Sequence, residues 1–272
     1  MLNRRRFLTG TTGFAVLGLA AAGAAARSLP GFENVAMRGS IDATELGVQP
    51  GALDDQSKKF ARMLRDASQR DMPVFLPPGT YAVSNLALPA RVRLAGVPGA
   101  TRIVYGGGGH LMQAEAAEHI ELMGLSFDGA NGWLADNVQG LLDLRQVANL
   151  AIDNCQVTGS GKHGIALENA RGCVERSTIS GAADAGLSSV QASGLSITGN
   201  TVSDCANGGI LVHRWQAGED GTMVTGNRVE RIGARSGGTP TLPTRRALAS
   251  ASASRPIRAC PAMSSRTHRF TA

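Results

Sequence analysis

The sequence predicts an all-β protein: a single-stranded parallel β-helix whose amino-terminal end is capped by an α-helix. Two apolar motifs recur with a basic period of 22 or 23 residues, and each alternates apolar and polar residues over only three to five positions before glycine or asparagine. The chain of 272 residues also has 35 glycines and only 4% aromatic residues, which favours small side chains and tight turns. Short strands at this period are what a coil turning through three sheets requires.

The two motifs define columns of residues that stack in successive coils. The first motif ends at residues separated by 30, 22, 23 and 27 positions, namely Phe127, Val157, Ile179, Val202 and Val229. The second motif begins at residues separated by 23, 22 and 23 positions, namely Leu142, Ile165, Leu187 and Ile210. Because two independent motifs keep one period, we assign residues 113–238 to β-helix repeats. We predict stacked parallel coils over residues 119–232, with the first set in one interior column.

A third column falls at a predicted turn inside the first motif, and consists of Cys155, Ser177, Asn200 and Asn227. Stacked amide side chains at such a turn can hydrogen-bond from coil to coil. We therefore predict a structural role for these asparagines. The spacings of Cys155, Cys173 and Cys205 match no zinc-binding pattern, so we interpret these cysteines as small buried apolar residues.

Residues 27–112 are predicted to hold the first coils and a helix over about 54–70. Asp54 or Asp55 suits the N-cap position of this helix. One helix face is apolar, formed by Phe60, Met63, Leu64 and Ala67. Because a solenoid otherwise exposes its first hydrophobic coil, we expect this helix to be the cap.

Residues 1–26 have the features of a secretory signal peptide, with arginines, then an uncharged apolar stretch, then alanines before Arg27. Arg4 and Arg5, followed by Phe7 and Leu8, resemble the twin-arginine export motif. The resemblance implies the twin-arginine export machinery as a partner, a periplasmic or secreted location, and no stable membrane span after cleavage. The alternative is an amino-terminal membrane anchor, which the four glycines of the apolar stretch disfavour.

The segment from Ile41 to Thr101 resembles the amino-terminal part of the pectate-lyase-like superfamily of right-handed β-helices. The similarity rests on Leu46–Val48, on the adjacent Asp54 and Asp55 before the helix, and on the run Pro73–Tyr81. With the export motif and the repeats, the chain resembles a family of exported bacterial repeat proteins. The resemblance implies a right-handed solenoid and a cell-envelope or extracellular polysaccharide as partner.

Charge is unevenly distributed along the chain. Of the 27 lysines and arginines, three lie in the first 26 residues and six after Gly238, whereas none of the 21 acidic residues lies in either stretch. The intervening part has a net charge of −3, so we predict no nucleic-acid partner. Residues 239–272 lack glycine and the repeat period. A disordered basic tail and a frameshift that replaced further coils both explain this composition, and the abrupt change favours the frameshift.

Chemistry on a β-helix must use outward side chains of neighbouring coils, because apolar columns fill the interior. One predicted column precedes the second motif and consists of Gln139, Lys162, Asp184 and Asn207. Another follows it and consists of Arg145, Glu168, Val190 and His213. Lys162 with Asp184, and Arg145 with Glu168, would be close enough for salt bridges. The structural alternative is that alternating charges only avoid like-charge stacking along the sheet.

We assign Lys162 and His163 as candidate acid or base groups with Asp184 as their partner, because Gly161 and Gly164 are expected to open the backbone around His163. The candidate substrate contacts are Asn207, His213, Arg214 and Trp215. Trp215, like Trp133, suits a sugar-stacking platform, and covering a coil edge is the alternative interpretation.

The sequence leaves catalysis open. It lacks the Asn-Thr-Asp and Gly-His-Gly motifs of polygalacturonase-like enzymes, and no predicted outward column holds two successive acids, as the calcium cluster of pectate lyases would require. We therefore predict no cofactor and no metal site. If the protein is an enzyme, we expect a polysaccharide lyase or glycoside hydrolase. The alternative is a non-catalytic scaffold or adhesin-like protein.

Overall fold

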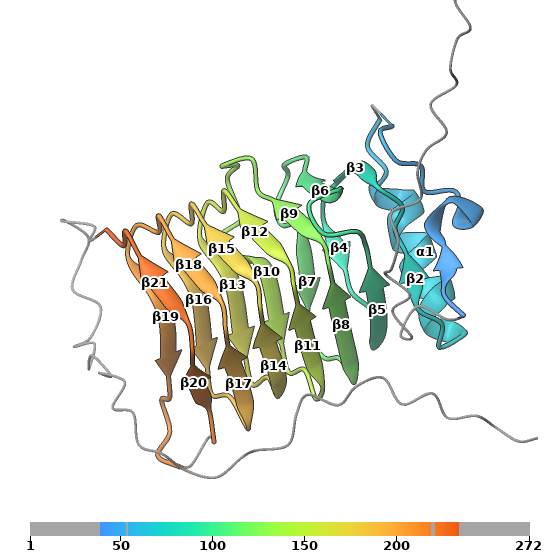
Figure 1. The fold of residues 1–272 in the computed structure, drawn as a ribbon. Helices are drawn as coiled ribbons and strands as arrows, with labels where there is room; N and C mark the ends of the chain where they lie inside the picture. The colour runs from blue at the N-terminus through green and yellow to red at the C-terminus, as the bar shows by residue number, and fades with distance from the viewer. Residues whose placement is uncertain (1–38, 53, 219–220, 234–272) are drawn as a thin grey trace, which may run out of the picture. The chain divides into compact units, whose positions relative to one another are not determined.

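The computed structural model describes residues 39–52, 54–218 and 221–233, which all belong to one compact unit. The predicted signal peptide and the predicted tail, with Cys260, lie outside the described residues. Strands stack in successive coils along one axis, and all strand pairings of the described part are parallel (Figure 1). The prediction of a parallel β-helix is confirmed. No helix of the described part has the length and apolar character needed to cross a bilayer.

Three sheets form the walls of the solenoid. Sheet A contains β1 (Ile41–Asp42), β2 (Val74–Phe75), β5 (Arg91–Ala95), β8 (His119–Met123), β11 (Leu150–Asp153), β14 (Gly172–Glu175), β17 (Leu195–Thr198) and β20 (Met223–Thr225). Sheet B contains β3 (Gly79–Val83), β6 (Thr101–Tyr105), β9 (Ser126–Asp128), β12 (Gln156–Thr158), β15 (Thr178–Ser180), β18 (Thr201–Ser203) and β21 (Arg228–Glu230). Sheet C contains β4 (Leu86–Ala87), β7 (Met112–Ala114), β10 (Gly140–Arg145), β13 (His163–Glu168), β16 (Ala185–Val190) and β19 (Gly208–His213).

The predicted interior column lies on sheet B in the expected register. Its five members are paired in sequence across β9, β12, β15, β18 and β21. Phe127, Val157, Ile179 and Val202 are fully buried, whereas Val229 is 47% exposed. Val229 stays in the column, but it belongs to the last described coil, and no described residue stacks on its far side. The second motif forms sheet C, where Leu142, Ile165, Leu187 and Ile210 are likewise paired.

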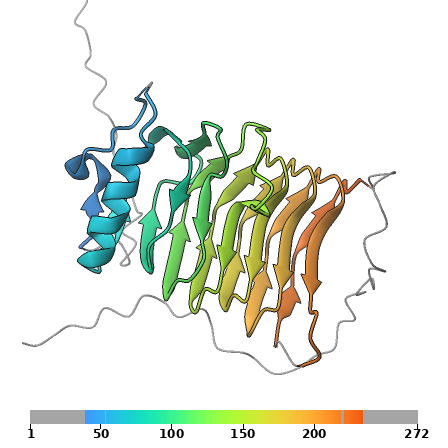
Figure 2. The same cartoon turned by 180° about the vertical axis from the view of Figure 1, so that it is seen from behind.

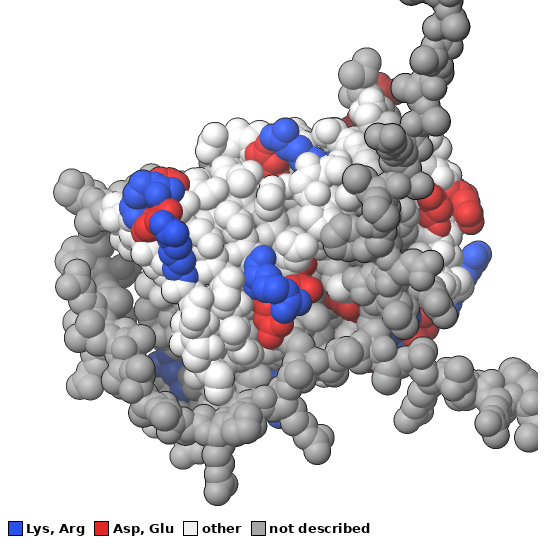
Figure 3. All heavy atoms as spheres, viewed as in Figure 1, with Lys and Arg blue, Asp and Glu red and all other residues white. Residues whose placement is uncertain are grey.

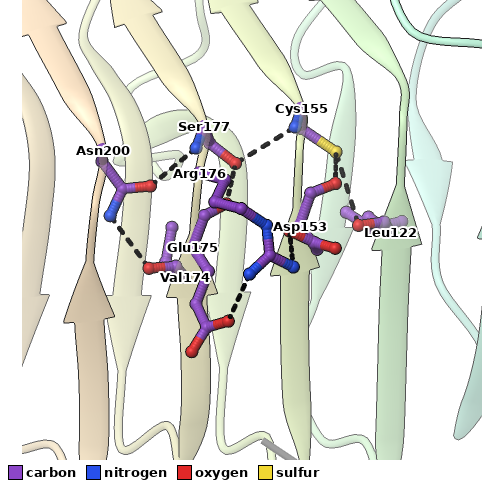
Figure 4. Close-up of polar contacts among 8 residues, drawn as sticks. All are labelled: Leu122, Asp153, Cys155, Val174, Glu175, Arg176, Ser177 and Asn200. Carbon is purple, nitrogen blue, oxygen red and sulfur yellow. Dashed lines mark hydrogen bonds and ion pairs between the residues drawn. The ribbon is translucent and has the colours of Figure 1, made fainter. Parts of the chain in front are cut away.

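A ladder of side chains joins the coils at the turn between sheets A and B (Figure 4). The Ser177 backbone N–H donates to Asn200 Oδ1 over 2.9 Å, and the Asn200 N–H donates to Asn227 Oδ1 over 2.8 Å. Asn200 Nδ2 also donates to the Val174 carbonyl over 2.9 Å, and Ser177 Oγ accepts from the Cys155 N–H over 3.1 Å. The predicted structural role of this column is therefore confirmed.

The ladder depends on a left-handed residue that precedes each of its members. These residues have φ between 47° and 66° and are Asn154, Arg176, Gly199 and Gly226. A single left-handed residue redirects the chain from one sheet to the next, and glycine or asparagine adopts it at least cost. Arg176 offsets part of that cost with ion pairs to Asp153 (2.6 Å) and Glu175 (3.3 Å).

Helix α1 (Ser57–Gln69), preceded by the short 3₁₀ helix η2 (Ala43–Leu46), closes the amino-terminal end of the solenoid (Figure 2). The predicted apolar face is buried, because Phe60, Met63, Leu64 and Ala67 all pack into the core. The predicted N-cap was wrong. Gln56 occupies that position, and its side chain exchanges two hydrogen bonds with the Gln49 backbone instead of capping the helix. Asp55 still accepts the N–H of Ser57 over 3.1 Å, so it binds one amide of the first turn.

Cys155 and Cys205 are buried free thiols, and Cys173 is also buried. Burial raises the pKa of the Cys155 thiol to about 12, which keeps it protonated and unreactive at neutral pH. Cys155 and Cys205 fill space beside the turns as small buried residues, as the sequence predicted, whereas Cys173 lies within β14.

Candidate functional site

The outward face of sheet C carries the predicted candidate residues. Leu142 and Leu144 point inward, so Asp143 and Arg145 between and after them point outward. The register then aligns the predicted column that follows the second motif, Arg145, Glu168, Val190 and His213. Backbone hydrogen bonds connect the predicted column that precedes it, from Asn207 N to the Asp184 carbonyl and from Asp184 N to the Lys162 carbonyl.

The Lys162 side chain binds the insertion between β9 and β10. Its ammonium group donates to the carbonyls of Ala135 (2.9 Å), Asp136 (3.2 Å) and Val138 (2.6 Å). Three acceptors use all three of its N–H donors. Within the described residues Lys162 and Asp184 form no salt bridge, so Lys162 fixes a loop and is poorly placed to exchange a proton with a substrate.

His163, Asp184 and Asn207 form a connected cluster along three coils. His163 Nδ1 lies 3.5 Å from Asp184 Oδ2 and accepts the backbone N–H of Ala185 over 3.1 Å. Asn207 Nδ2 donates to Asp184 Oδ1 over 2.8 Å. Burial lowers the pKa of His163, although the carboxylate of Asp184 opposes that shift. The neutral imidazole therefore carries its proton on Nε2, and Nδ1 serves as an acceptor inside the solenoid wall.

The glycines around His163 have a packing role. A Cβ on Gly164 would lie 2.7 Å from Ile179 Cγ2, and a Cβ on Gly161 would lie 2.4 Å from the Gly132 carbonyl oxygen. Gly186 and Gly209 are equally restricted: a Cβ on Gly186 would lie 2.3 Å from Val202 Cγ1, and a Cβ on Gly209 would lie 2.3 Å from Val229 Cγ1. Glycine at 164, 186 and 209 lets sheet C approach the interior column, and Gly161 lets the turn before β13 approach the backbone of Gly132. The glycines themselves are therefore no evidence of a binding site.

Asp143 is a buried carboxylate that the sequence analysis did not single out. It is only 1% exposed, although it lies on the outward face. Its oxygens accept from the Gln139 N–H (3.1 Å) and from Arg145 Nη2 (2.7 Å) and Nε (3.1 Å). Arg145 thus pairs with Asp143, and within the described residues it forms no salt bridge with Glu168. An isolated acid among the leucines of β10 was the only sequence signal for this pair.

Two exposed tryptophans stand on opposite borders of sheet C. Trp133 lies in the insertion between β9 and β10, where sheet B leads into sheet C, and it is 67% exposed. Trp215 follows β19, where sheet C leads into sheet A, and it is 75% exposed. Arg214 beside it donates to the carbonyls of Gln216 and Ala192. Because both rings are largely exposed, neither serves mainly to cover a coil edge.

The candidate residues form two groups rather than one. His163, Asp184 and Asn207 lie at or just before the first residues of the sheet C strands, whereas His213, Arg214 and Trp215 lie at or just after the end of β19. From Gly208 to His213 the strand rises about 16 Å at roughly 3.3 Å per residue. The two groups can contact different parts of one long ligand, but they cannot meet at one reacting bond.

On the face of the described part seen in Figure 3, charge is not concentrated in one region. Figure 3 shows small groups in which basic and acidic side chains touch, surrounded by uncharged surface. Arg102 with Asp128, and Arg231 with Asp204 (2.7 Å), are pairs of this kind. In the described part, no group of three or more His, Cys, Asp or Glu residues is arranged to hold a metal ion.

Comparison with known proteins agrees with this architecture. A family model described as "Right handed beta helix region" matches residues 106–239. The chain is a right-handed parallel β-helix. Among solved structures, ORF18 of Geobacillus virus E2 aligns with a TM-score of 0.52 and 13% identity, over 74% of this chain and 42% of that one. The Agl-KA catalytic domain aligns with a TM-score of 0.31 and 13% identity, over 71% of this chain and 48% of that one.

This β-helix therefore spans less than half the length of either solved chain, and the likeness to ORF18 concerns the fold alone. No curated protein matches the sequence.

We predict that the stability of this β-helix depends on pH through His163. Its pKa is lowered in the folded state, so the unfolded chain binds more protons once the pH falls below the ordinary histidine value of about 6.5. We expect the free energy of unfolding to fall between pH 8 and pH 5.5, and to fall less in His163→Asn, whose amide oxygen can accept the Ala185 N–H. Denaturant titrations of both proteins at the two pH values measure this, and equal pH dependence would contradict it.

Proposed function

We propose that this β-helix is an exported protein that binds a polysaccharide along the outward face of sheet C. The observation that carries the proposal is the position of Trp133 and Trp215, two exposed indole rings that flank this face on opposite borders. Aromatic rings present large apolar faces on which sugar rings stack. Strands β10 and β19 are three coils apart, so the two rings are separated by about 14 Å along the solenoid axis, at roughly 4.8 Å per coil. That spacing suits a chain of several sugar units.

The charges of the face favour a neutral, hydroxyl-rich polymer over a polyanion. Arg145 is neutralised by Asp143, Lys162 is bound to carbonyls, and His163 is neutral at physiological pH. Asp184 and Asn207 remain partly exposed and offer carboxylate and amide groups that hydrogen-bond to hydroxyls. Such a surface supplies acceptors and donors for sugar hydroxyls, and it does not require the ligand to be charged.

The contacts favour binding over cleavage. Glycoside hydrolysis ordinarily needs two carboxyl groups about 5–9.5 Å apart across the scissile bond. Asp143 is buried against Arg145, and Asp184 lies at the opposite end of the strands from Glu168. His163 remains a candidate acid or base only through Nε2, because Nδ1 is occupied by the Ala185 amide.

Affinity electrophoresis and calorimetry with a panel of neutral and acidic polysaccharides test the proposal. We expect a neutral polymer to bind, and Trp215→Ala to weaken binding about tenfold, since one aromatic contact is worth roughly 1 kcal/mol or more. Thr178→Ala, an exposed change on sheet B, is the matched control and should leave affinity unchanged. Wild-type affinity in both Trp133→Ala and Trp215→Ala would contradict the proposal.

The same panel tests for cleavage. New reducing ends would indicate hydrolysis, and absorbance from unsaturated ends would indicate elimination. If no polymer binds, the second candidate function is a structural scaffold. The observation that favours the scaffold is that Arg145, Lys162 and Arg214 all use their donors on partners within the chain.

Export through the twin-arginine machinery is part of the proposal and is supported by Arg4, Arg5, Phe7 and Leu8. Replacing both Arg4 and Arg5 by lysine should retain the protein in the cytoplasm. Fractionation of cells that express the two forms measures this, and continued export of the double variant would contradict it.

A further inference from the structure

A polar cluster lies on sheet C beside the insertion that carries Trp133. It consists of His110, just before β7, Gln113 on β7 and Asp143 on β10. The strand register pairs Gln113 with Asp143 across adjacent strands. His110 is within electrostatic reach of the same carboxylate, because burial lowers the pKa of His110 and Asp143 opposes that shift. The three side chains therefore share one place on the outward face.

Two nitrogen atoms of this cluster lack a hydrogen-bond partner. His110 Nε2 and Gln113 Nε2 are both buried, and neither has a partner among the described residues. By contrast, the oxygens of Asp143 are bound by Arg145 and by the Gln139 N–H. A buried polar group without a partner destabilises the folded state. Two of them three residues apart indicate a site that an occupant completes.

The insertion between β9 and β10 holds Trp133 near this cluster. Tyr105 Oη donates to the Trp133 carbonyl over 3.0 Å and accepts the Gly109 N–H over 2.7 Å. The Ala135 N–H donates to the Gly109 carbonyl over 2.8 Å. Because Gly109 immediately precedes His110, these bonds fix the backbone of the insertion beside the cluster. A sugar chain that stacks on the Trp133 indole would pass close to it.

We infer that His110 and Gln113 bind a hydroxyl group of a neutral sugar chain, one unit of which stacks on Trp133. The choice of ligand rests on the proposed function, to which the inference adds a subsite. A hydroxyl group both donates and accepts, so it satisfies the Gln113 amide together with either tautomer of the neutral imidazole. A carboxylate would find no free cation here, since Arg145 is bound to Asp143. An ammonium group offers no acceptor to the amide.

The two nitrogens are covered in the free protein, but their residues are partly exposed. His110 and Gln113 both have intermediate exposure, and partly exposed side chains change rotamer within nanoseconds. Such a rotation can turn the nitrogens toward a ligand while β7 stays paired with β4 and β10. An ordered water molecule has the same hydrogen-bonding chemistry, and it differs from a sugar hydroxyl in that added sugar does not change it.

Gln113→Leu tests the subsite, because it replaces the amide with an apolar group of similar size. We expect this variant to be at least as stable as the wild type in denaturant titrations, since it removes a buried donor that has no partner. We also expect it to bind a neutral polysaccharide of the panel about fivefold more weakly. Gln156→Leu, the same change at an exposed position on sheet B, is the matched control and should leave affinity unchanged.

Nuclear magnetic resonance of the isotope-labelled full chain tests the site with free glucose, galactose, mannose and xylose. We expect at least one of these sugars to shift the ring nitrogen signals of His110, which are identified by their loss in His110→Gln. The signals of His119 on sheet A should not shift. If ordered water is the only occupant, no sugar will shift the His110 signals.

The inference is overturned if Gln113→Leu is less stable than the wild type, because the amide would then serve the fold. It is also overturned if no sugar shifts His110. If polymer binding depends on Trp133 and Trp215 but not on Gln113, the proposed function stands and the inference falls. If no polymer binds, but a sugar shifts His110 and Gln113→Leu abolishes the shift, the inference stands and the proposed function is wrong.

Discussion

Val202→Asp should leave the protein unfolded. Val202 is fully buried in the interior column between Ile179 and Val229, and the backbone of Gly186 lies against its Cγ1 atom. A carboxylate there has no cation or hydrogen-bond donor in the apolar column, so it would be buried without a partner. We expect a loss of more than about 4 kcal/mol, most of the stability of a typical domain.

Circular dichroism and limited proteolysis of the purified variant measure the loss. Thr201→Asp is the matched control, because Thr201 is adjacent in β18 but points outward and is paired with Arg228. The control should fold like the wild type. A folded, cooperative Val202→Asp protein would disprove the register on which the site assignments depend.

Asn200→Ala should cost about 2–4 kcal/mol without abolishing the fold. The Asn200 side chain accepts the Ser177 N–H and donates to the Val174 carbonyl, and Asn200 is itself buried. Alanine leaves both backbone groups without these partners, at roughly 1–3 kcal/mol for each. Because Asn200 belongs to the coil that follows the one carrying both groups, its side chain joins two coils, and we expect the loss to appear as a lower midpoint of one cooperative denaturant transition.

Asn207→Ala provides the comparison for this experiment. Asn207 is exposed and donates to Asp184 at the surface, so its removal should change stability by about 0.5 kcal/mol or less. Equal losses in the two variants would show that the ladder does not stabilise the stack of coils more than a surface contact does.

The sequence was sufficient to predict the coils because the same environment recurs in each of them. Val157, Ile179 and Val202 occupy equivalent places, so their spacing reports the length of one coil directly. Insertions do not hide the period. The extra residues before Gly140 and after His213 lie between strands, and the strands remain in register. The ladder was predictable for the same reason, because each member lies at the same turn.

The site was less predictable because spacing fixes where a residue lies but not which atoms its side chain meets. Lys162 and Asp184 are one coil apart as expected, yet the lysine turns toward the carbonyls of residues 135–138. Arg145 selects Asp143 on its own strand over Glu168 on the next one. Each long cationic side chain has several acceptors within reach, and the insertions that supply some of them carry no period.

The sequence by itself determined the fold class, the order of the coils, the interior columns and the capping helix. Burial of apolar residues at a fixed period is a property of the sequence pattern, so these features did not require coordinates. Only the tertiary structure decided that Gly161 and Gly164 serve packing and that Asp143 is buried beside Arg145. Those features depend on which atoms each side chain meets, which a repeat period does not specify.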